Sequence, residues 1–367
     1  CPGEVRLVPY REEYAGRVPP ACWGRIAPMK LVIATPLYPP EPGGPATYAK
    51  LLEEHLPSRG IDVVLVKFGD VRHLPRFVRH FAYYRKVRAA LSEADAVIAL
   101  DPVSVGLPAM RAAKKLKKPL FVKIVGDYAW EQGIQRFGVK ETLDEFVKRT
   151  DVPFPVRVLR DIQRDVTDAA QSVIVPSTYL KTIVSTWGVP SEKIRVIYNA
   201  VEVTELGGVP ESVSVLPRPL VVSAGRLMPW KRMDTVIEAV QKIGASLAIV
   251  GDGPEKIRLE TLAPTAVFTG ALSHEDTLAV VKHADVFALA SSYEGLSHLL
   301  IEARLLGTPT VATKAGGNAE VVEEGNLVPV GDADALAAAL ARVLTSGRPD
   351  TEGPKERFSV RGMIDSV

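Results

Sequence analysis

Short apolar runs alternate with helix-length segments along nearly the whole chain. Twelve runs of three to six residues are mostly apolar throughout rather than alternating with polar residues, which indicates strands buried on both faces of a parallel sheet. The predicted strands are Leu31–Ala34, Val63–Val66, Ala96–Leu100, Leu120–Val125, Val173–Val175, Ile194–Ile197, Leu220–Ala224, Leu247–Val250, Ala266–Phe268, Val286–Ala290, Thr310–Ala312 and Leu327–Val330. Both halves of the chain are therefore predicted to be α/β.

The segments between the runs carry helix signals. An apolar stripe predicts a helix over residues 233–243, Ser273 can cap a helix over 274–284, and residues 332–346 are rich in Ala and Leu. Two such α/β halves predict two doubly wound, Rossmann-like domains that face each other. Their strand carboxyl ends, and hence their binding loops, would surround a central cleft.

The domain boundaries follow from composition. Residues 203–219 are rich in Gly, Pro and Ser without a sustained period and are predicted to link a first domain, 29–202, to a second, 220–347. Residues 348–367 form a C-terminal tail. Residues 1–28 show neither a regular period nor the apolar core of a signal peptide, so they are expected to be a poorly ordered extension or a mis-assigned upstream segment.

Composition narrows the class of protein. A chain of 367 residues with 47% hydrophobic and 24% charged residues suits two globular domains, and no apolar run is long enough to span a bilayer. Both cysteines, Cys1 and Cys22, precede Met29, so a disulfide framework is excluded for the rest and a cytoplasmic location is expected. Residues 29–202 carry 26 Lys and Arg against 19 Asp and Glu, whereas 203–367 carry 15 against 21. This asymmetry favours an anionic partner for the first half.

The segment Tyr293–Ala303, Y-E-G-L-S-H-L-L-I-E-A, holds the clearest candidate chemistry. Glu294 and Gly295 follow a predicted strand, and a helix is predicted to begin near Ser297. The unpaired N–H groups of a helix start favour an anion. Glu302 lies about a turn and a half into this helix, so it can reach the same cleft as Glu294 and accept hydrogen bonds from hydroxyls. The expected ligand is a diphosphate joined to a sugar.

Two further motifs follow predicted strands. Gly43 and Gly44 let the backbone approach a phosphate or a sugar, although the same residues also suit a plain Pro/Gly loop. Arg226 and Lys231 can neutralise a diphosphate and stabilise it as it leaves; the alternative is a solvated basic turn that includes Arg232.

The run Gly251-Asp252-Gly253 also follows a strand. It has only two of the three glycines of the dinucleotide fingerprint and lacks the Lys-Ser/Thr pair of a P-loop, so a nucleotide contact and a tight strand-to-helix turn both remain open. Asp127 is a carboxylate at the end of a first-domain strand, where it can act in the cleft or simply cap a helix. The six histidines show no metal-ligand spacing, so neither a metal nor a cofactor is expected.

Residues 71–90 contain six Lys or Arg, two His, four aromatic residues and no acid. This composition suits an anionic membrane surface, which would place the protein peripherally at the inner face of a membrane, or a lipid-linked phosphate. No RNA- or DNA-binding motif accompanies it, so nucleic acid is not an expected partner. The alternative is a solvated basic helix face.

With these motifs in this order, followed by G-G-N-A-E at 316–320, the chain resembles glycosyltransferase family 4 over roughly residues 29–345. The most specific part is S-S-Y-E-G-L-S-H-L-L-I-E-A, and I-Y-N-A-V-E at 197–202 resembles the segment that closes the two domains in that family. The resemblance implies the GT-B fold and retaining transfer from a nucleoside diphosphate sugar.

The resemblance also implies residue roles. Arg226 and Lys231 would bind the donor diphosphate, Glu302 the ribose of the nucleotide, and Glu294 the transferred sugar. The backbone amides of Ser297, His298 and Leu299 would add contacts, and Gly44 would close on the donor from the first domain.

One position departs from the family pattern. Many members carry a histidine where this chain has Gly126, and Asp127 is the expected substitute for it.

The sequence therefore predicts a metal-independent, retaining hexosyltransferase. Its acceptor would be a sugar, a lipid-linked molecule or a cell-envelope glycan. Two other readings remain open. One is a GT-B epimerase of sugar nucleotides, which product analysis would distinguish, and the other is a non-catalytic, two-domain sugar-binding protein.

Overall fold

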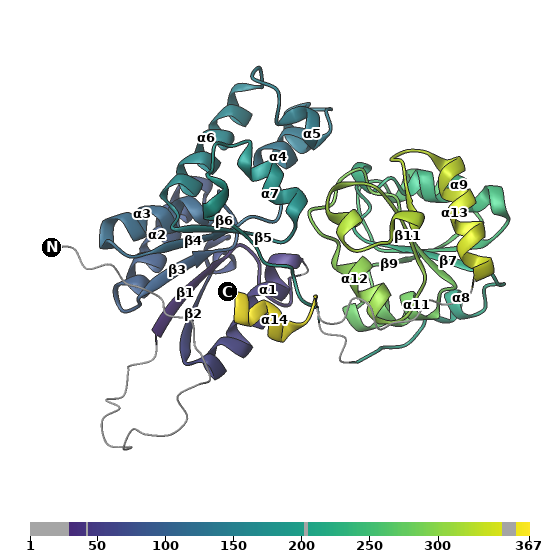
Figure 1. Cartoon of the computed structure of the whole chain (residues 1–367), viewed down its shortest axis with the longest axis horizontal. Coiled ribbons are helices and arrows are strands. Elements are labelled where there is room, and N and C mark those ends of the chain that lie inside the picture. Colours follow the sequence, from purple (N-terminus) through teal and green to yellow (C-terminus); the bar gives the residue numbers. More distant parts are fainter. Residues whose placement is uncertain (1–28, 42, 202–204, 347–356) are drawn as a thin grey trace.

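The computed structural model describes residues 29–41, 43–201, 205–346 and 357–367, and each half of the chain forms a six-stranded sheet (Figure 1). The strand orders are β2-β1-β3-β4-β5-β6 and β12-β11-β10-β7-β8-β9, with every neighbouring pair parallel. The strands are β1 (Met29–Thr35), β2 (Ile61–Lys67), β3 (Ala96–Ala99), β4 (Leu120–Lys123), β5 (Ser172–Val175), β6 (Ile194–Val196), β7 (Leu220–Ala224), β8 (Ser246–Val250), β9 (Val267–Gly270), β10 (Val286–Leu289), β11 (Thr310–Thr313) and β12 (Leu327–Val328). Two Rossmann-like domains of the GT-B type are thus confirmed.

Every predicted apolar run forms a strand, with ends that differ by a few residues. At Leu120–Val125, for example, β4 ends two residues early, at Lys123, because the chain turns toward Asp127, the N-cap of the next helix. The predicted extension over residues 1–28 lies outside the described residues, as do 203–204 of the predicted linker and 348–356 of the tail.

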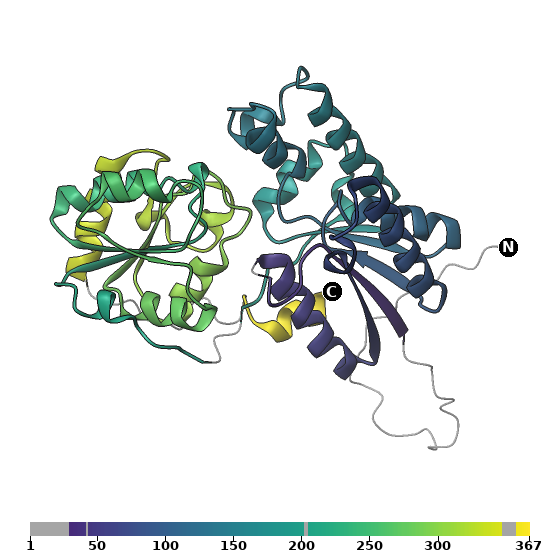
Figure 2. The same cartoon turned by 180° about the vertical axis from the view of Figure 1, so that it is seen from behind.

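Helices cover both faces of each sheet (Figures 1 and 2). They are α1 (Gly44–His55), α2 (Arg76–Ser92), α3 (Gly106–Leu116), α4 (Tyr128–Arg136), α5 (Leu143–Phe146), α6 (Phe154–Ala169), α7 (Thr178–Ser185), α8 (Glu211–Ser214), α9 (Met233–Ile243), α10 (Lys256–Leu262), α11 (His274–His283), α12 (His298–Leu305), α13 (Ala333–Ser346) and α14 (Val360–Ser366). In the part of the chain described, no helix combines the length and apolar character needed to cross a bilayer.

The apolar core of each domain lies in two layers, one on each side of the sheet. Along β1, Val32 and Ala34 face one apolar cluster whereas Leu31 and Ile33 face the other, as the two-residue period of a strand requires. The second domain repeats this pattern in β7, where Val221 faces one apolar cluster and Val222 faces the other. Burial on both faces explains why the strands read as continuous apolar runs.

Two segments outside the sheets, the predicted linker and the C-terminal tail, contribute buried side chains to the domain cores. Within the predicted linker, α8 buries Val213 completely in the core of the second domain. The last helix, α14, returns to the first domain, where Met363 and Ile364 join the cluster that contains Tyr48 of α1 (Figure 2). The chain therefore crosses between the two domains twice.

The amino end of α7 contacts the second domain directly. Glu320 of the second domain accepts hydrogen bonds from the amides of Thr178 and Tyr179, both at 3.0 Å. Ser177, the N-cap of α7, donates to the carbonyl of Gly295 at 2.7 Å. Because the first amides of a helix have no intrahelical partner, this contact satisfies groups that would otherwise be left unpaired.

Candidate active site between the two domains

A cavity of about 840 Å³ lies between the domains, at the carboxyl ends of their strands. Its lining from the first domain, and from the crossing segment 197–201 where the chain first crosses to the second domain, consists of Gly43, Gly44, Pro45, Thr47, Val125, Pro176 and Asn199. From the second domain it is lined by Gly225, Arg226, Lys231, Val250, Gly251, Asp252, Ala271, Leu272, His274, Thr277, Glu294, Leu296, Ser297, His298, Leu299 and Glu302. Most residues predicted from sequence as donor-binding are therefore brought together in one place.

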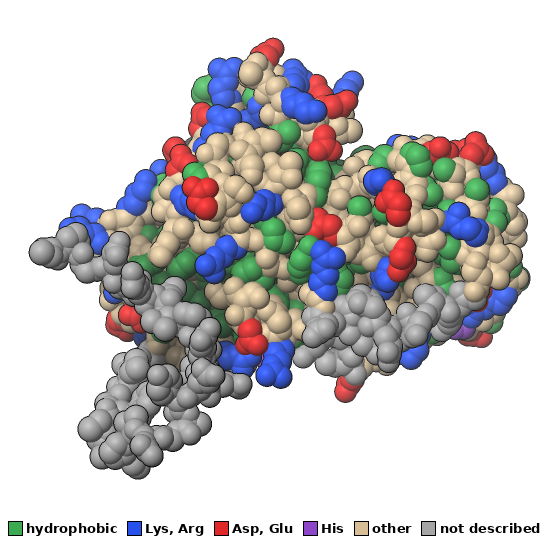
Figure 3. All heavy atoms as spheres, viewed as in Figure 1, with side chains coloured by type: hydrophobic (Ala, Val, Ile, Leu, Met, Phe, Trp, Pro, Cys, Tyr) green, Lys and Arg blue, Asp and Glu red, His purple; other side chains and the backbone are tan. Residues whose placement is uncertain are grey.

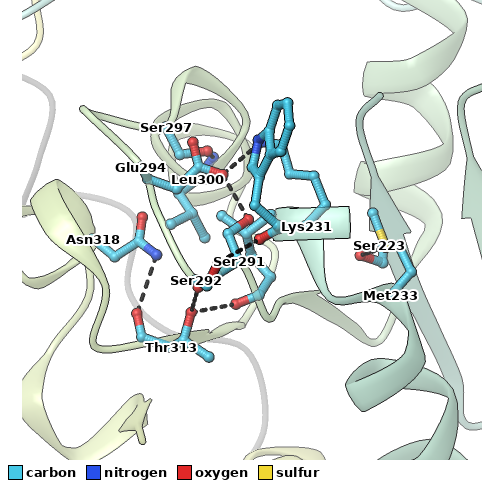
Figure 4. A network of polar contacts seen from close by, with 12 residues as sticks. Ser223, Lys231, Met233, Ser291, Ser292, Glu294, Ser297, Leu300, Thr313 and Asn318 are labelled. Atoms are coloured by element: carbon cyan, nitrogen blue, oxygen red, sulfur yellow. Dashed lines mark hydrogen bonds and ion pairs between the residues drawn. The ribbon is translucent and has the colours of Figure 1, made fainter. Parts of the chain in front are cut away.

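Lys231 and Glu294 form an ion pair inside this cavity (Figure 4). Lys231 Nζ lies 2.5 Å from Glu294 Oε1, and Ser291 Oγ donates to the same oxygen at 2.7 Å. The two paired side chains are 19% and 12% exposed, so the pair is largely shielded from water. An ammonium group has three donors, so Lys231 can hold Glu294 and still donate to a second anion. Arg226, whose side chain is exposed, lines the same cavity.

The start of α12 adds backbone donors to the cavity. Ser297 is its N-cap and accepts a hydrogen bond from the amide of Leu300. The amides of His298 and Leu299 precede the first intrahelical hydrogen bond and are therefore open to a ligand. Burial lowers the pKa of His298, which favours the neutral ring, and its Nε2 then accepts from the Asn199 amide at 2.9 Å.

Glu302 is 3% exposed and projects into the same cavity. Its Oε1 lies 3.2 Å from Nε2 of His274, and this hydrogen bond raises the pKa of His274. Its Oε2 is buried and has no hydrogen-bond partner among the described residues. Because such an oxygen costs about 1–3 kcal/mol, a ligand hydroxyl is expected to occupy this place. His274 was not predicted as a site residue. The sequence signal that could have indicated it is its position shortly after the end of a strand.

Two of the predicted glycines serve chain packing rather than the cavity. A Cβ on Gly253 would lie 2.5 Å from the carbonyl oxygen of Leu227, and one on Gly295 would lie 2.4 Å from that of Val125. Neither glycine lines the cavity, unlike Gly251 and Asp252. The prediction that Gly253 and Gly295 contact the donor is corrected accordingly, because each is required where two backbones touch.

Asp127 does not lie in the cleft as predicted. It is 1% exposed and is the N-cap of α4, where its Oδ1 accepts from the amide of Trp130 at 2.9 Å. Gln163 donates to the same oxygen at 3.4 Å, on the side away from the main cavity. Asp127 lines only a small pocket within the first domain and not the main cavity, so the structure does not bring it to the donor site as predicted. The helix-capping alternative holds.

Glu131, one helical turn beyond Asp127, lies beside Gly126 and lines a smaller, second cavity in the first domain. A Cβ on Gly126 would lie 2.5 Å from Glu131 Oε1 and 2.9 Å from the hydroxyl of Tyr293. The absence of a side chain at Gly126 therefore makes room for this carboxyl group. Burial, together with the nearby Asp127 and Asp101, raises the pKa of Glu131 to about 7.

Two protein-family models and several known proteins match this chain. Residues 42–205 match the family model described as Glycosyltransferase Family 4, and residues 210–357 match the model for Glycosyl transferases group 1. A GDP-mannose-dependent alpha-mannosyltransferase of Mycobacterium tuberculosis is 26% identical over 312 residues, which cover 82% of this chain and 75% of that protein.

Two solved structures share the fold over nearly the whole chain. Sucrose-phosphate synthase from Thermosynechococcus elongatus aligns with a TM-score of 0.72 at 21% identity, covering 91% of this chain and 96% of that one. Anabaena HepE in complex with UDP-glucose aligns with a TM-score of 0.68 at 20% identity, covering 92% and 97%.

The two facing domains and their shared cavity define a glycosyltransferase of the GT-B class. Because the two family models match successive halves of the chain, it is a family 4-like glycosyltransferase. It is an enzyme of the hexosyltransferase type that acts on nucleotide sugars. The comparisons favour neither the epimerase nor the non-catalytic sugar-binding protein.

The raised pKa of Glu131 predicts a pH-dependent stability difference between the wild type and Glu131→Gln. The folded protein retains the proton up to about pH 7, whereas the unfolded chain releases it near the ordinary value of 4.5. Relative to the variant, the wild type should therefore lose stability as the pH rises from 4.5 to about 7 and then change no further. Thermal unfolding of both proteins across this range measures the effect. A difference that is constant with pH would contradict it.

Proposed function

We propose that this enzyme transfers a hexose, with retention of configuration, from a nucleoside diphosphate sugar to an acceptor held by the first domain. The observation that carries the proposal is the largely buried pair of Lys231 and Glu294 beside the amino end of α12, all in one cavity between the domains. Cations and helix amides suit a diphosphate, and carboxylates suit sugar hydroxyls.

The proposed binding mode assigns one part of the donor to each group. Lys231, Arg226 and the amides of α12 hold the diphosphate, and the unpaired Oε2 of Glu302 accepts from the ribose. Both recorded contacts to Glu294 use Oε1, which leaves Oε2 to accept from the transferred sugar. Gly44, across the cavity and next to His298, closes on the sugar.

In the proposed reaction, the acceptor oxygen forms a bond to the anomeric carbon as the bond from that carbon to the diphosphate breaks. The acceptor attacks from the face that the diphosphate leaves, and its proton passes to a departing phosphate oxygen. Negative charge grows on the diphosphate, and the fixed cations and helix amides stabilise it without reorganisation. A metal ion is not required in this scheme.

The choice of first donor to test comes from the relatives. The mycobacterial relative is GDP-mannose-dependent by name, whereas HepE was solved with UDP-glucose. We therefore take GDP-mannose as the leading donor and UDP-glucose as its competitor in the assays below.

Replacing either donor-site cation by Ala should weaken donor binding or turnover by about 2–5 kcal/mol. Lys231→Ala is expected to be the more damaging, because it also leaves the partly buried Glu294 without its partner. Isothermal titration with GDP and steady-state kinetics with GDP-mannose measure the two effects. Arg258→Ala, an exposed arginine on α10 paired only with nearby Glu255, is the matched control. Wild-type behaviour of both site variants would reject the site.

Transfer should persist in EDTA, because Lys231 and Arg226 occupy the role that a metal ion would play at the diphosphate. The same reaction should give a product whose anomeric configuration equals that of the donor, as determined by NMR. Activity that vanishes in EDTA and returns with Mn²⁺ or Mg²⁺ would count against the metal-free scheme. Inversion of the anomeric centre would count against the retaining one.

We further propose that α2 rests on an anionic membrane surface. Val78 and Phe81 are 51% and 62% exposed, and Arg85 and Arg88, also exposed, lie at the helical spacing that continues the same stripe. Apolar side chains followed by cations suit the boundary between acyl chains and headgroups. The face seen in Figure 3 intersperses charges of both signs over both domains.

Vesicle binding tests the membrane proposal. The wild type should sediment with vesicles that contain phosphatidylglycerol more than with phosphatidylcholine alone, and salt should weaken the binding. A variant with Phe81→Ser, Arg85→Gln and Arg88→Gln should lose most of it, since each surface cation contributes about 1 kcal/mol. Equal sedimentation with both vesicle types, or an unaffected variant, would return α2 to a solvated basic face.

A further inference from the structure

The first domain contains a second cavity, of about 370 Å³, that adjoins the main one. Pro45 and Val125 line both cavities, so the two spaces meet at these residues. A molecule held in the second cavity would therefore face the sugar end of a donor held in the first.

Arg79, from α2, gives the second cavity a cation with an unused donor. Its side chain lines the cavity and is partly exposed; its Nε is buried without a hydrogen-bond partner among the described residues, so its terminal Nη groups are the donors that a ligand could use. Its guanidinium carbon lies 5.8 Å from the centre of the Phe68 ring, which holds the group along the cavity wall. Leaving a charged donor unpaired out of water is costly, so this guanidinium is suited to an incoming oxyanion.

The other arginine of the cavity is already engaged. Arg72 pairs with Glu41 and also donates to the carbonyl of Pro36 at 3.1 Å. It adds positive charge nearby, whereas Arg79 supplies the spare donor. The two arginines differ in this respect although both come from the basic stretch predicted to face a membrane.

Carboxyl groups from two other elements line the same cavity. Asp101 is committed to its own loop, where Oδ1 accepts from the amides of Val103 and Ser104, each at 2.6 Å. Glu131 lies at the junction with the main cavity, beside Gly126. A ligand that is anionic throughout would be repelled by these groups, whereas hydroxyls can donate to them.

This inference rests on the proposed transferase function and names its acceptor class. We propose that the second cavity binds the acceptor and that the acceptor is a hydroxylated molecule bearing one oxyanion, in the first instance a phosphate. Arg79 binds the oxyanion and so determines acceptor specificity. Glu131 accepts a hydrogen bond from the hydroxyl that lies toward the donor sugar. A soluble sugar or polyol phosphate and a phospholipid headgroup share this chemistry.

Inorganic phosphate is the first probe, used with the donor cavity filled by saturating GDP. Phosphate should then raise the melting temperature of the wild type and of Arg157→Gln, an exposed arginine on α6 of the same domain. In Arg79→Gln the apparent phosphate affinity should fall by about tenfold or more. No phosphate effect on the wild type, or an equal one in Arg79→Gln, would overturn the proposal.

Measurements with GDP alone distinguish a failure of this inference from a failure of the proposed donor site. Stabilisation of all three proteins by GDP alone, with phosphate selective for Arg79, supports both. If GDP stabilises none of them but phosphate still depends on Arg79, the donor site fails and the anion site stands. GDP binding without Arg79-dependent phosphate binding is the reverse case and overturns only the present inference.

Glycerol 3-phosphate tests the hydroxyl end of the site. It should bind the GDP-filled wild type more tightly than inorganic phosphate does, and Glu131→Ala should remove this difference while leaving the phosphate affinity unchanged. An equal loss for both ligands, or no loss, would overturn the role of Glu131.

A short-chain phosphatidylglycerol, kept monomeric, then identifies the source of the phosphate. It presents a glycerol phosphate with acyl chains but without a membrane surface. Tighter Arg79-dependent binding than that of glycerol 3-phosphate points to a lipid headgroup, and weaker binding points to a soluble phosphate. Both results support an anionic acceptor, whereas binding of either ligand that ignores Arg79→Gln contradicts it.

Discussion

The geometry of the active site depends on the capping of α7 by the second domain. Glu320 accepts from two amides of α7 and from the hydroxyl of Tyr198 at 2.8 Å, so one carboxylate ties both a first-domain helix and the crossing segment to the second domain. Hydrogen bonds to a charged group are worth about 1.5–3 kcal/mol each. The cap therefore contributes directly to how the two domains meet.

The same loop reaches the proposed donor site through a short chain of hydrogen bonds. Asn318, two residues before Glu320, donates to the carbonyl of Thr313, whose hydroxyl donates to the carbonyl of Ser291 (Figure 4). Ser291 in turn holds Glu294 against Lys231. Gly317 lets the loop approach, since a Cβ there would lie 2.3 Å from the carbonyl of Gly295. The contact that joins the domains and the carboxylate proposed to bind the sugar are thus parts of one connected structure.

Among the described residues, three of the seven buried polar atoms without partners belong to residues that line the two cavities. Glu302 Oε2 and Asn199 Oδ1 belong to residues of the main cavity, Arg79 Nε to one of the second, and the Tyr293 hydroxyl lies beside Gly126 at their junction. Unpaired groups of this kind each cost about 1–3 kcal/mol, so those near a cavity call for an explanation. Their placement extends the functional region from the donor cleft into the first domain. That extension underlies the proposed acceptor site.

The sequence by itself determined the strands, the parallel α/β class and the candidate carboxylates Glu294 and Glu302, because these rest on local periodicity and on position after a strand. Glu302 and the helix start at Ser297 lie where the pattern placed them. Only the tertiary structure decided that Asp127 caps α4 whereas Glu131, four residues on, lines a cavity. It also decided the pairing of Lys231 with Glu294 and the exposure of Arg79 to a cavity. Such partners lie far apart in the chain, and their meeting depends on how whole layers pack, which no local pattern encodes.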